Sequence, residues 1–227
     1  MEGLFINILG KPEGLIISQL IAACRFTIYL SLIAFVGGGI LGILITFVRI
    51  IPNKFVNKFS CSYVWLFQSV PLLMLLFLSG LGVPRLLGYD IDPWIAATLS
   101  LVIFTSAYLS EVWRGSIIAV SQGQWEAAKS INLNFTLSLV LIIIPQAFKY
   151  SVAPTISFLI QIIKGPSLAY IIGFQDLMLL GKRWANAPVP GSERFIIFPI
   201  MAVMYFCLCY PLAVYAKHLE KKILINN

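Results

Sequence analysis

Charged residues are scarce in this sequence. Only 11% of its 227 residues are charged, and 59% are hydrophobic. A soluble globular domain carries about a quarter charged residues. The mean hydropathy is +0.93. Because so little polar surface cannot cover a globule in water, the composition predicts an integral membrane protein.

Groups suited to catalysis or nucleotide binding are also few. The single histidine, His218, lies in a basic C-terminal tail. The sequence contains neither the H-E-x-x-H pattern of zinc proteases nor the G-x-S-x-G pattern of serine hydrolases. The phosphate-binding loop G-x-x-x-x-G-K-[ST] is absent, and Gly181-Lys182-Arg183 lacks its hydroxyl residue. We therefore predict no enzyme activity, and no cofactor or metal bound by this chain.

The cysteines number only four, and each has apolar neighbours: Cys24, Cys61, Cys207 and Cys209. Cys207 and Cys209 are two residues apart, so on a helix they point in different directions and do not share a metal. We predict thiols that pack as small, buried hydrophobic groups.

Long apolar runs, by contrast, are abundant. A helix needs about 20 apolar residues to cross a bilayer, and about five runs suffice, near residues 20–48, 57–81, 93–120, 137–163 and 195–217. The shorter run Gly165–Leu180 contains glycine, proline and aspartate, which favours a partial or re-entrant helix; a six-span protein is the alternative. The spacing Gly38-x-x-x-Gly42 predicts close helix packing.

Basic residues predict the orientation. The net charge of +7 does not indicate a nucleic-acid partner, because the basic residues lie at the ends of apolar runs. The first connection and the C-terminal tail are both basic, through Arg49, Lys54, Lys58, Lys217, Lys221 and Lys222. The positive-inside rule places both in the cytoplasm and the N-terminus outside. Lys182, Arg183 and Arg194 then fall outside, a mild violation of the rule.

A polar patch, QWEAAKS, separates two apolar runs at Gln124–Ser130. Ser121 and Gln124 form the S-x-x-Q pattern of a capping box, and Asn132 suits a left-handed stop. The pattern predicts a helix over residues 122–132. Two interpretations follow: an interfacial helix anchored by Trp125, or a docking surface that presents Glu126 to another protein.

The same stretch resembles the EAA motif of the membrane subunits of bacterial ABC importers, E-A-A-x3-G-x9-I-x-L-P. Glu126-Ala127-Ala128 is followed, at the spacing of the motif, by Asn132 in place of glycine and by Ile142-Ile143-Ile144-Pro145. Residues 106–130, 145–173 and, more loosely, 67–77 are similar to the polar amino-acid permease family. The resemblance covers residues 14–222 approximately.

The resemblance implies an all-α type I ABC importer transmembrane domain over residues 1–227, in the bacterial plasma membrane. It implies a second permease subunit, an ATPase dimer that binds ATP and Mg, and an extracytoplasmic binding protein that delivers an amino acid. The helix at 122–132 would be the coupling helix that docks on the ATPase. Its implied contact residues are Gln124, Trp125, Glu126, Ala127, Ala128, Asn132 and Pro145.

Polar groups within the spans are the candidates for a substrate path. They are Gln68, Ser106, Glu111, Arg114, Gln161, Lys164 and Ser167. Glu111 and Arg114 are three residues apart, which favours pairing with each other over contact with substrate. Lys164 either binds the carboxylate of a substrate or snorkels to the outer interface.

Two segments depart from the family pattern. Gln68-Ser69-Val70-Pro71 lacks the usual arginine, and Lys164-Gly165-Pro166-Ser167-Leu168 replaces Lys-Asp-Thr-Ser-Leu. These departures fit one half of a heterodimer, a homodimer being the alternative. They also leave opines, polyamines or sulfur compounds as alternative substrates. A stand-alone secondary transporter is the remaining alternative.

Overall fold

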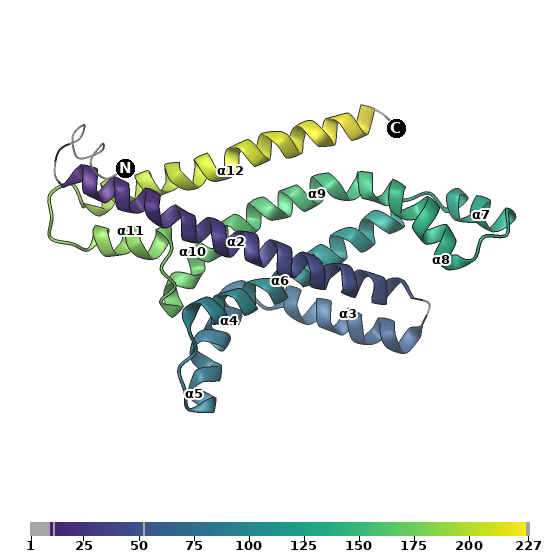
Figure 1. Cartoon of the computed structure of the whole chain (residues 1–227), viewed down its shortest axis with the longest axis horizontal. Helices are drawn as coiled ribbons and strands as arrows, with labels where there is room; N and C mark the ends of the chain where they lie inside the picture. Colours follow the sequence, from purple (N-terminus) through teal and green to yellow (C-terminus); the bar gives the residue numbers. More distant parts are fainter. Residues whose placement is uncertain (1–9, 11, 52, 226–227) are drawn as a thin grey trace.

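The computed structural model describes residue 10 and residues 12–51 and 53–225, which form an elongated helical bundle (Figure 1). Four long helices dominate the described residues: α2 (Glu13–Ile50), α6 (Pro93–Ile118), α9 (Ile144–Lys164) and α12 (Arg194–Ile225). Shorter helices are α3 (Lys54–Ser69), α4 (Leu72–Phe77), α5 (Val83–Leu87), α7 (Gln122–Ser130), α8 (Phe135–Ser138), α10 (Pro166–Ala169) and α11 (Leu177–Ala185). The predicted all-α membrane fold is confirmed.

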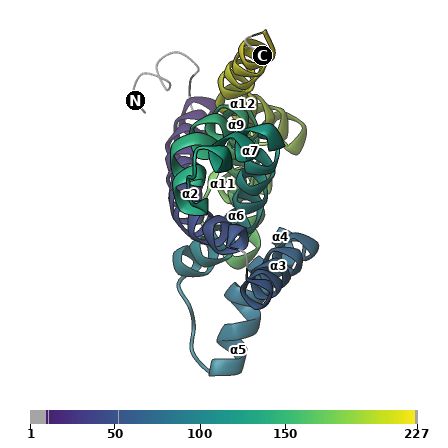
Figure 2. The ribbon, with the colours of Figure 1, turned by 90° about the vertical axis from the view of Figure 1, so that its right-hand side faces the viewer.

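The two ends of the bundle carry different elements. The first turns of α2 lie beside α11 at one end, whereas α7, α8 and the last turn of α2 lie at the other (Figure 1). Viewed along the bundle, α3, α4 and α5 lie to one side of the remaining helices (Figure 2). Four segments are long and apolar enough to cross a membrane, and the bent pair formed by α3 and α4–α5 raises that number to five within the described residues.

The run near residues 57–81 is not one straight helix. It breaks between Ser69 and Leu72, and the two parts meet at 96°. Pro71 explains the break, because a proline disfavours helical geometry in the residue before it; Val70 is extended, with ψ 125°. The segment after the break therefore projects from the bundle (Figure 1).

Two prolines in α5 and α9 are each preceded by a π-helical turn. The turns are Leu78–Gly82, before Pro84, and Leu139–Ile143, before Pro145. In each, the residue before the proline donates its N–H to a carbonyl five residues back. A proline has no N–H, and its ring clashes with the carbonyl four residues back. The wider π turn gives the ring room without ending the helix.

The segment Gly165–Leu180 is not the separate partial helix that the sequence suggested. After Lys164 the chain continues through α10 and a 3₁₀ turn (Tyr170–Ile172), so that Phe135–Ile172 forms one candidate span. The span ends at Gly173, whose φ of 86° is accessible to glycine at little cost. The remainder of the segment begins α11.

The cysteine prediction is wrong for two of the four residues. Cys209 is buried and Cys24 is partly buried, but Cys61 and Cys207 are exposed on this chain. Their helices, α3 and α12, lie at the margins of the bundle and bury few side chains (Figure 2).

The most extensive helix contact joins α2 to α6. A Cβ atom on Gly38 would lie 2.4 Å from Cβ of Thr105, and one on Gly42 would lie 3.2 Å from the backbone oxygen of Ser106. Thr46, one turn further along α2, donates to the Ser110 carbonyl at 3.3 Å. The Gly38–Gly42 spacing thus allows the close packing that the sequence predicted.

We predict that Gly38→Ala destabilises the bundle by about 1–3 kcal/mol, because the added methyl group overlaps the Thr105 side chain. Gly39→Ala is the matched control, since its Cβ would lie 3.8 Å from the Trp113 ring, an ordinary contact. Thermal unfolding of the two purified variants measures the difference. Equal midpoints for both variants would contradict the close approach of α2 and α6.

Candidate functional site

Helix α7 presents a small exposed face at one end of the bundle. Ala128 is completely buried, whereas Glu126 and Ala127 are exposed. Trp125 is partly buried and stacks on Phe135 with ring centroids 5.6 Å apart. The indole therefore packs within the protein and holds α7 against α8.

Asn132 ends α7 as predicted. Its φ is 60°, and it is the one non-glycine residue with positive φ in the described part of the chain. Asn132 N–H donates to Lys129 O at 2.9 Å, and Leu133 N–H donates to Ala128 O at 3.1 Å. The second bond is the six-to-one bond of a Schellman motif. Asparagine thus performs the stop that the EAA motif assigns to glycine.

The capping-box prediction is wrong in its hydrogen bonds. Ser121 is the residue that precedes α7, but its side chain caps no N–H group. Gln124 instead accepts a bond of 3.2 Å from Nε2 of Gln146, which lies one residue after Pro145. This bond joins α7 to the first turn of α9.

A hydrophobic cluster packs α7 against the π turn and the first turn of α9. Its fully or largely buried members are Val120, Leu139, Ile143 and Ala147, with Trp125 packed against them. Leu139 and Ile143 are the first and last residues of the π turn, so α7 contacts the part of the chain where helix geometry is least regular. A displacement of α7 would act directly on the start of α9.

A cavity of about 500 Å³ lies between α3, α6 and α9. Its lining includes Gln68, Tyr108, Glu111, Gly115, Tyr150 and Pro154. A volume of this size is typical of small-molecule sites. Two of the predicted path residues, Gln68 and Glu111, therefore share one cavity. Gln68 is partly fixed there, because its Nε2 donates to Ala107 O at 3.3 Å.

Two arginines hold Glu111. Arg114 donates from Nε at 3.2 Å and forms an ion pair through Nη2, as the i,i+3 spacing predicted. Arg49, at the end of α2, pairs with Oε2, the oxygen that also accepts from Arg114 Nε. No sequence pattern pointed to Arg49, because it lies 62 residues from Glu111 in the chain. Two guanidinium groups around one carboxylate leave a net positive charge beside the cavity.

The other predicted path residues lie elsewhere. Ser106 is buried and shares a hydrogen bond of 2.7 Å with Tyr63, so it does not face the cavity. Gln161 and Lys164 are exposed near the far end of α9. Ser167 donates to the Lys164 carbonyl at 2.6 Å and so serves as a turn residue.

An exposed stripe on α9 connects the cavity to Lys164. Its members, spaced three or four residues apart, are Pro154, Ser157, Gln161 and Lys164. Residues at this spacing share one face of a helix. Polar side chains on an exposed face of a span avoid hydrocarbon by facing water or another protein. The stripe therefore marks the face of α9 that is not directed to lipid.

Asp176 is a buried carboxylate that the sequence reading did not single out. It lies between the Phe135–Ile172 span and α11, where its Oδ1 accepts from Leu179 N–H at 2.9 Å. Tyr205 of α12 donates its hydroxyl to Oδ2 at 3.4 Å. Burial raises the pKa of the Asp176 carboxyl to about 6, despite these hydrogen bonds. Asp176 joins α11 to α12 and is not part of the cavity.

We predict that Glu111→Gln lowers stability by about 2 kcal/mol, because the largely buried Arg49 side chain loses its charged partner. Thermal unfolding measures the loss, with the exposed Glu220→Gln as the control. The double variant Arg49→Met/Glu111→Gln removes the unpaired charge and is expected to recover most of the stability. A Glu111→Gln variant as stable as the original protein would show that the ion pairs contribute nothing.

Together, these observations define a multi-span membrane protein with a hollow between α3, α6 and α9 and a short helix with an exposed face at one end. Residues 38–225 match the family described as the binding-protein-dependent transport system inner membrane component. The chain belongs to this family, and so is a membrane component of a transport system.

Curated relatives cover most of the chain. It is 30% identical over 200 residues to the probable glutamine ABC transporter permease protein GlnM of Bacillus subtilis (strain 168), covering 87% of this chain and 89% of the relative. It is 29% identical over 220 residues to the glutamate transport system permease protein GluC of Corynebacterium efficiens, covering 92% of this chain and 96% of the relative.

Solved structures share the fold. A chain from the crystal structure of an amino acid ABC transporter with histidines superposes with a TM-score of 0.82 at 27% identity, covering 89% of this chain and 93% of that chain. A chain of the MetNI methionine ABC transporter in an inward-facing conformation superposes with a TM-score of 0.71 at 17% identity, covering 94% of this chain and 98% of that chain. The second similarity bears on the fold alone.

Proposed function

We propose that this chain is the permease subunit of an ATP-driven ABC importer for polar or charged amino acids. The observation that carries the proposal is the cavity beside Arg49, Glu111 and Arg114, from which the polar stripe of α9 runs to Lys164. An amino acid carries both a carboxylate and an ammonium group. A path with charges of both signs suits such a substrate, and relatives named for glutamine and glutamate transport support the choice.

The proposed path contains two positions at which charged side chains contact the substrate. Lys164, at the outer end of α9, meets the substrate carboxylate first, and the cavity beside Glu111 receives the substrate afterwards. Ser157 and Gln161 lie between them on the same helix face. The second permease subunit covers the opposite side of the path. A heterodimer is slightly favoured over a homodimer, because the segments at Gln68 and Lys164 depart from the family pattern.

Helix α7 is the proposed coupling helix. Its exposed face offers Glu126 and Ala127 to a cleft of the ATPase, which binds ATP and Mg. Closure of the ATPase dimer would displace α7, and the contacts of Trp125 and Gln124 would pass the displacement to α8 and α9. Alternating access then follows from two packed arrangements of rigid helices. In this orientation α7 and the C-terminus are cytoplasmic and the N-terminus is outside.

Glu126→Lys is expected to abolish uptake and to weaken association with the ATPase, because it reverses the charge on the exposed face of α7. Membrane insertion should be unchanged, since Glu126 makes no buried contact. Co-purification of the ATPase and uptake of radiolabelled glutamine or glutamate measure the two effects. Glu220→Lys, an exposed charge reversal in α12, is the control. Full uptake by Glu126→Lys would overturn the coupling role of α7.

Lys164→Ala is expected to reduce uptake about tenfold, the effect of losing one charged hydrogen bond to the substrate. Assembly with the ATPase should not change, because Lys164 is the last residue of α9. Helix α7 lies at the opposite end of α9 (Figure 1). Lys182→Ala is a control, since that ammonium lies over the Tyr170 ring at 4.1 Å. Uptake equal to that of the original protein would remove Lys164 from the path.

A further inference from the structure

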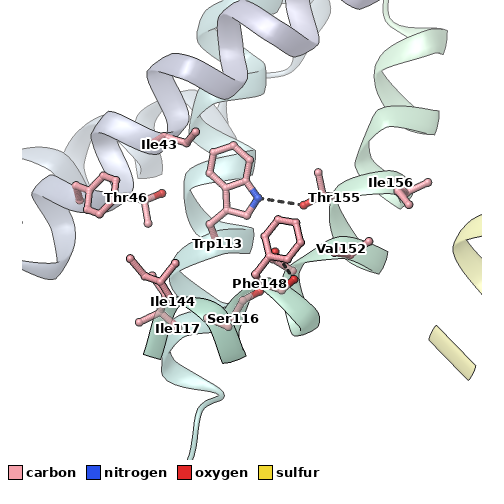
Figure 3. Close-up of a pocket in the computed structure, with 13 residues that line it drawn as sticks. Ile43, Thr46, Trp113, Ser116, Ile117, Ile144, Phe148, Val152, Thr155 and Ile156 are labelled. Carbon is pink, nitrogen blue, oxygen red and sulfur yellow. Dashed lines mark hydrogen bonds between the residues drawn. The ribbon is translucent and has the colours of Figure 1, made fainter. Parts of the chain in front are cut away.

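A second, mainly apolar hollow shares Ser116 with the cavity beside Glu111 but meets α9 on another face. It is a groove of about 450 Å³ between α2, α6 and α9 (Figure 3). Ile43 and Phe47 line it from α2, Trp113 from α6, and Phe148 and Val152 from α9. We call these residues and their neighbours the apolar groove. On α9, Phe148 and Val152 lie on the side opposite Pro154 and Ser157, so the groove and the path use different faces.

The polar atoms in the apolar groove already have partners. Trp113 Nε1 donates to Thr155 Oγ1 at 3.0 Å, which closes the back of the groove (Figure 3). The remaining hydroxyl groups donate to backbone carbonyls: Thr46 to Gly42, Ser116 to Val112 and Ser151 to Phe148, at 2.7–2.9 Å. A ligand therefore meets hydrocarbon and aromatic surface, and a group that needs hydrogen bonds would lose them.

The mouth of the apolar groove continues into an apolar helix surface. Ile40, Ile43, Leu44 and Phe47 are all exposed on α2 and share one helix face. Phe148 is 68% exposed at the opposite rim. A face of this kind on a membrane span is directed to lipid. The groove is thus a gap in the protein surface that adjoins bilayer hydrocarbon.

A cation lies near the α7 end of the apolar groove. Lys149 is exposed and lies three residues before Val152, on the same side of α9. It forms no salt bridge within the described residues, where the ion pairs involve Arg49, Arg114 and Glu111. Its long side chain can reach the membrane interface while its methylene groups stay in hydrocarbon. Lys149 complements the charge of an anionic headgroup.

We propose that the apolar groove binds one acyl chain of an anionic phospholipid, with the headgroup phosphate at Lys149. The lipid belongs to the leaflet on the α7 side, which is cytoplasmic in the proposed orientation. That leaflet attracts basic residues near the interface through its anionic lipids. The bound acyl chain fills the space between α2 on one side and α6 and α9 on the other. Helices α6 and α9 are the two that flank α7. The bound acyl chain thereby holds α9 against α2.

Quenching of tryptophan fluorescence by dibrominated phosphatidylglycerol tests the proposal. The assembled transporter is reconstituted in phosphatidylcholine vesicles with increasing amounts of the brominated lipid. The contribution of Trp113 is the part of the quenching that Trp113→Phe removes. Val152→Phe, which fills the groove, is expected to weaken this quenching about tenfold, as for roughly two methylene groups removed from apolar contact. Val203→Phe, the same change at an exposed site on α12, should leave it unchanged.

Lys149→Gln addresses the headgroup. It is expected to reduce the preference for brominated phosphatidylglycerol over brominated phosphatidylcholine about fivefold. Equal quenching in Val152→Phe and Val203→Phe would overturn the acyl-chain site, leaving bulk lipid contact only. A second permease chain in the groove would shield Trp113 from the brominated lipid in the assembled transporter. Trp113 would then be quenched only when the permease subunits are separated, and this result would also overturn the acyl-chain site. An unchanged preference in Lys149→Gln would overturn the headgroup contact.

Discussion

The close approach of α2 and α6 is the constraint on which the remaining structure depends. The backbones meet at Gly38 and Gly42, so that nothing larger than glycine fits between Thr105 and α2. Because the two helices are fixed there, Arg49 reaches Glu111 at one end. At the other end, the rings of Phe26 and Trp94 meet edge to face at 6.2 Å. Both helices line the apolar groove, and α6 also lines the cavity beside Glu111.

Local features of the site follow from the sequence, and distant ones do not. The stop at Asn132 and the pair of Glu111 with Arg114 depend on neighbours within one helical turn, and both were predicted. The second partner of Glu111 depends on how α2 packs against α6, which periodicity does not reveal. The predicted capping box fails at Gln124 for the same reason, because the partner of Gln124 lies in the first turn of α9.

The same limit applies to the fold. Hydropathy is enough to find the apolar segments, because a span must satisfy its own backbone hydrogen bonds. It does not reveal the 96° bend after α3 or the continuation of α9 through Gly165, since both depend on local backbone geometry and tertiary packing. Gly165 is enclosed, with a Cβ position 2.8 Å from Leu101 Cδ2. Glycine and proline in an apolar segment suggest that the helix ends there. The same residues can instead mark a position where a neighbouring helix packs too closely for a larger side chain.

The π turn before Pro145 has a consequence for chain length. A π turn contains one residue more than the α turn it replaces. Removing a residue from Leu139–Ile143 would restore α geometry only by bringing the Pro145 ring against the backbone, and it would rotate every side chain before the turn relative to α9. The number of residues between α7 and α9 is thus set by a proline ring rather than by the thickness of the membrane. Insertions and deletions in this family are expected to avoid this turn.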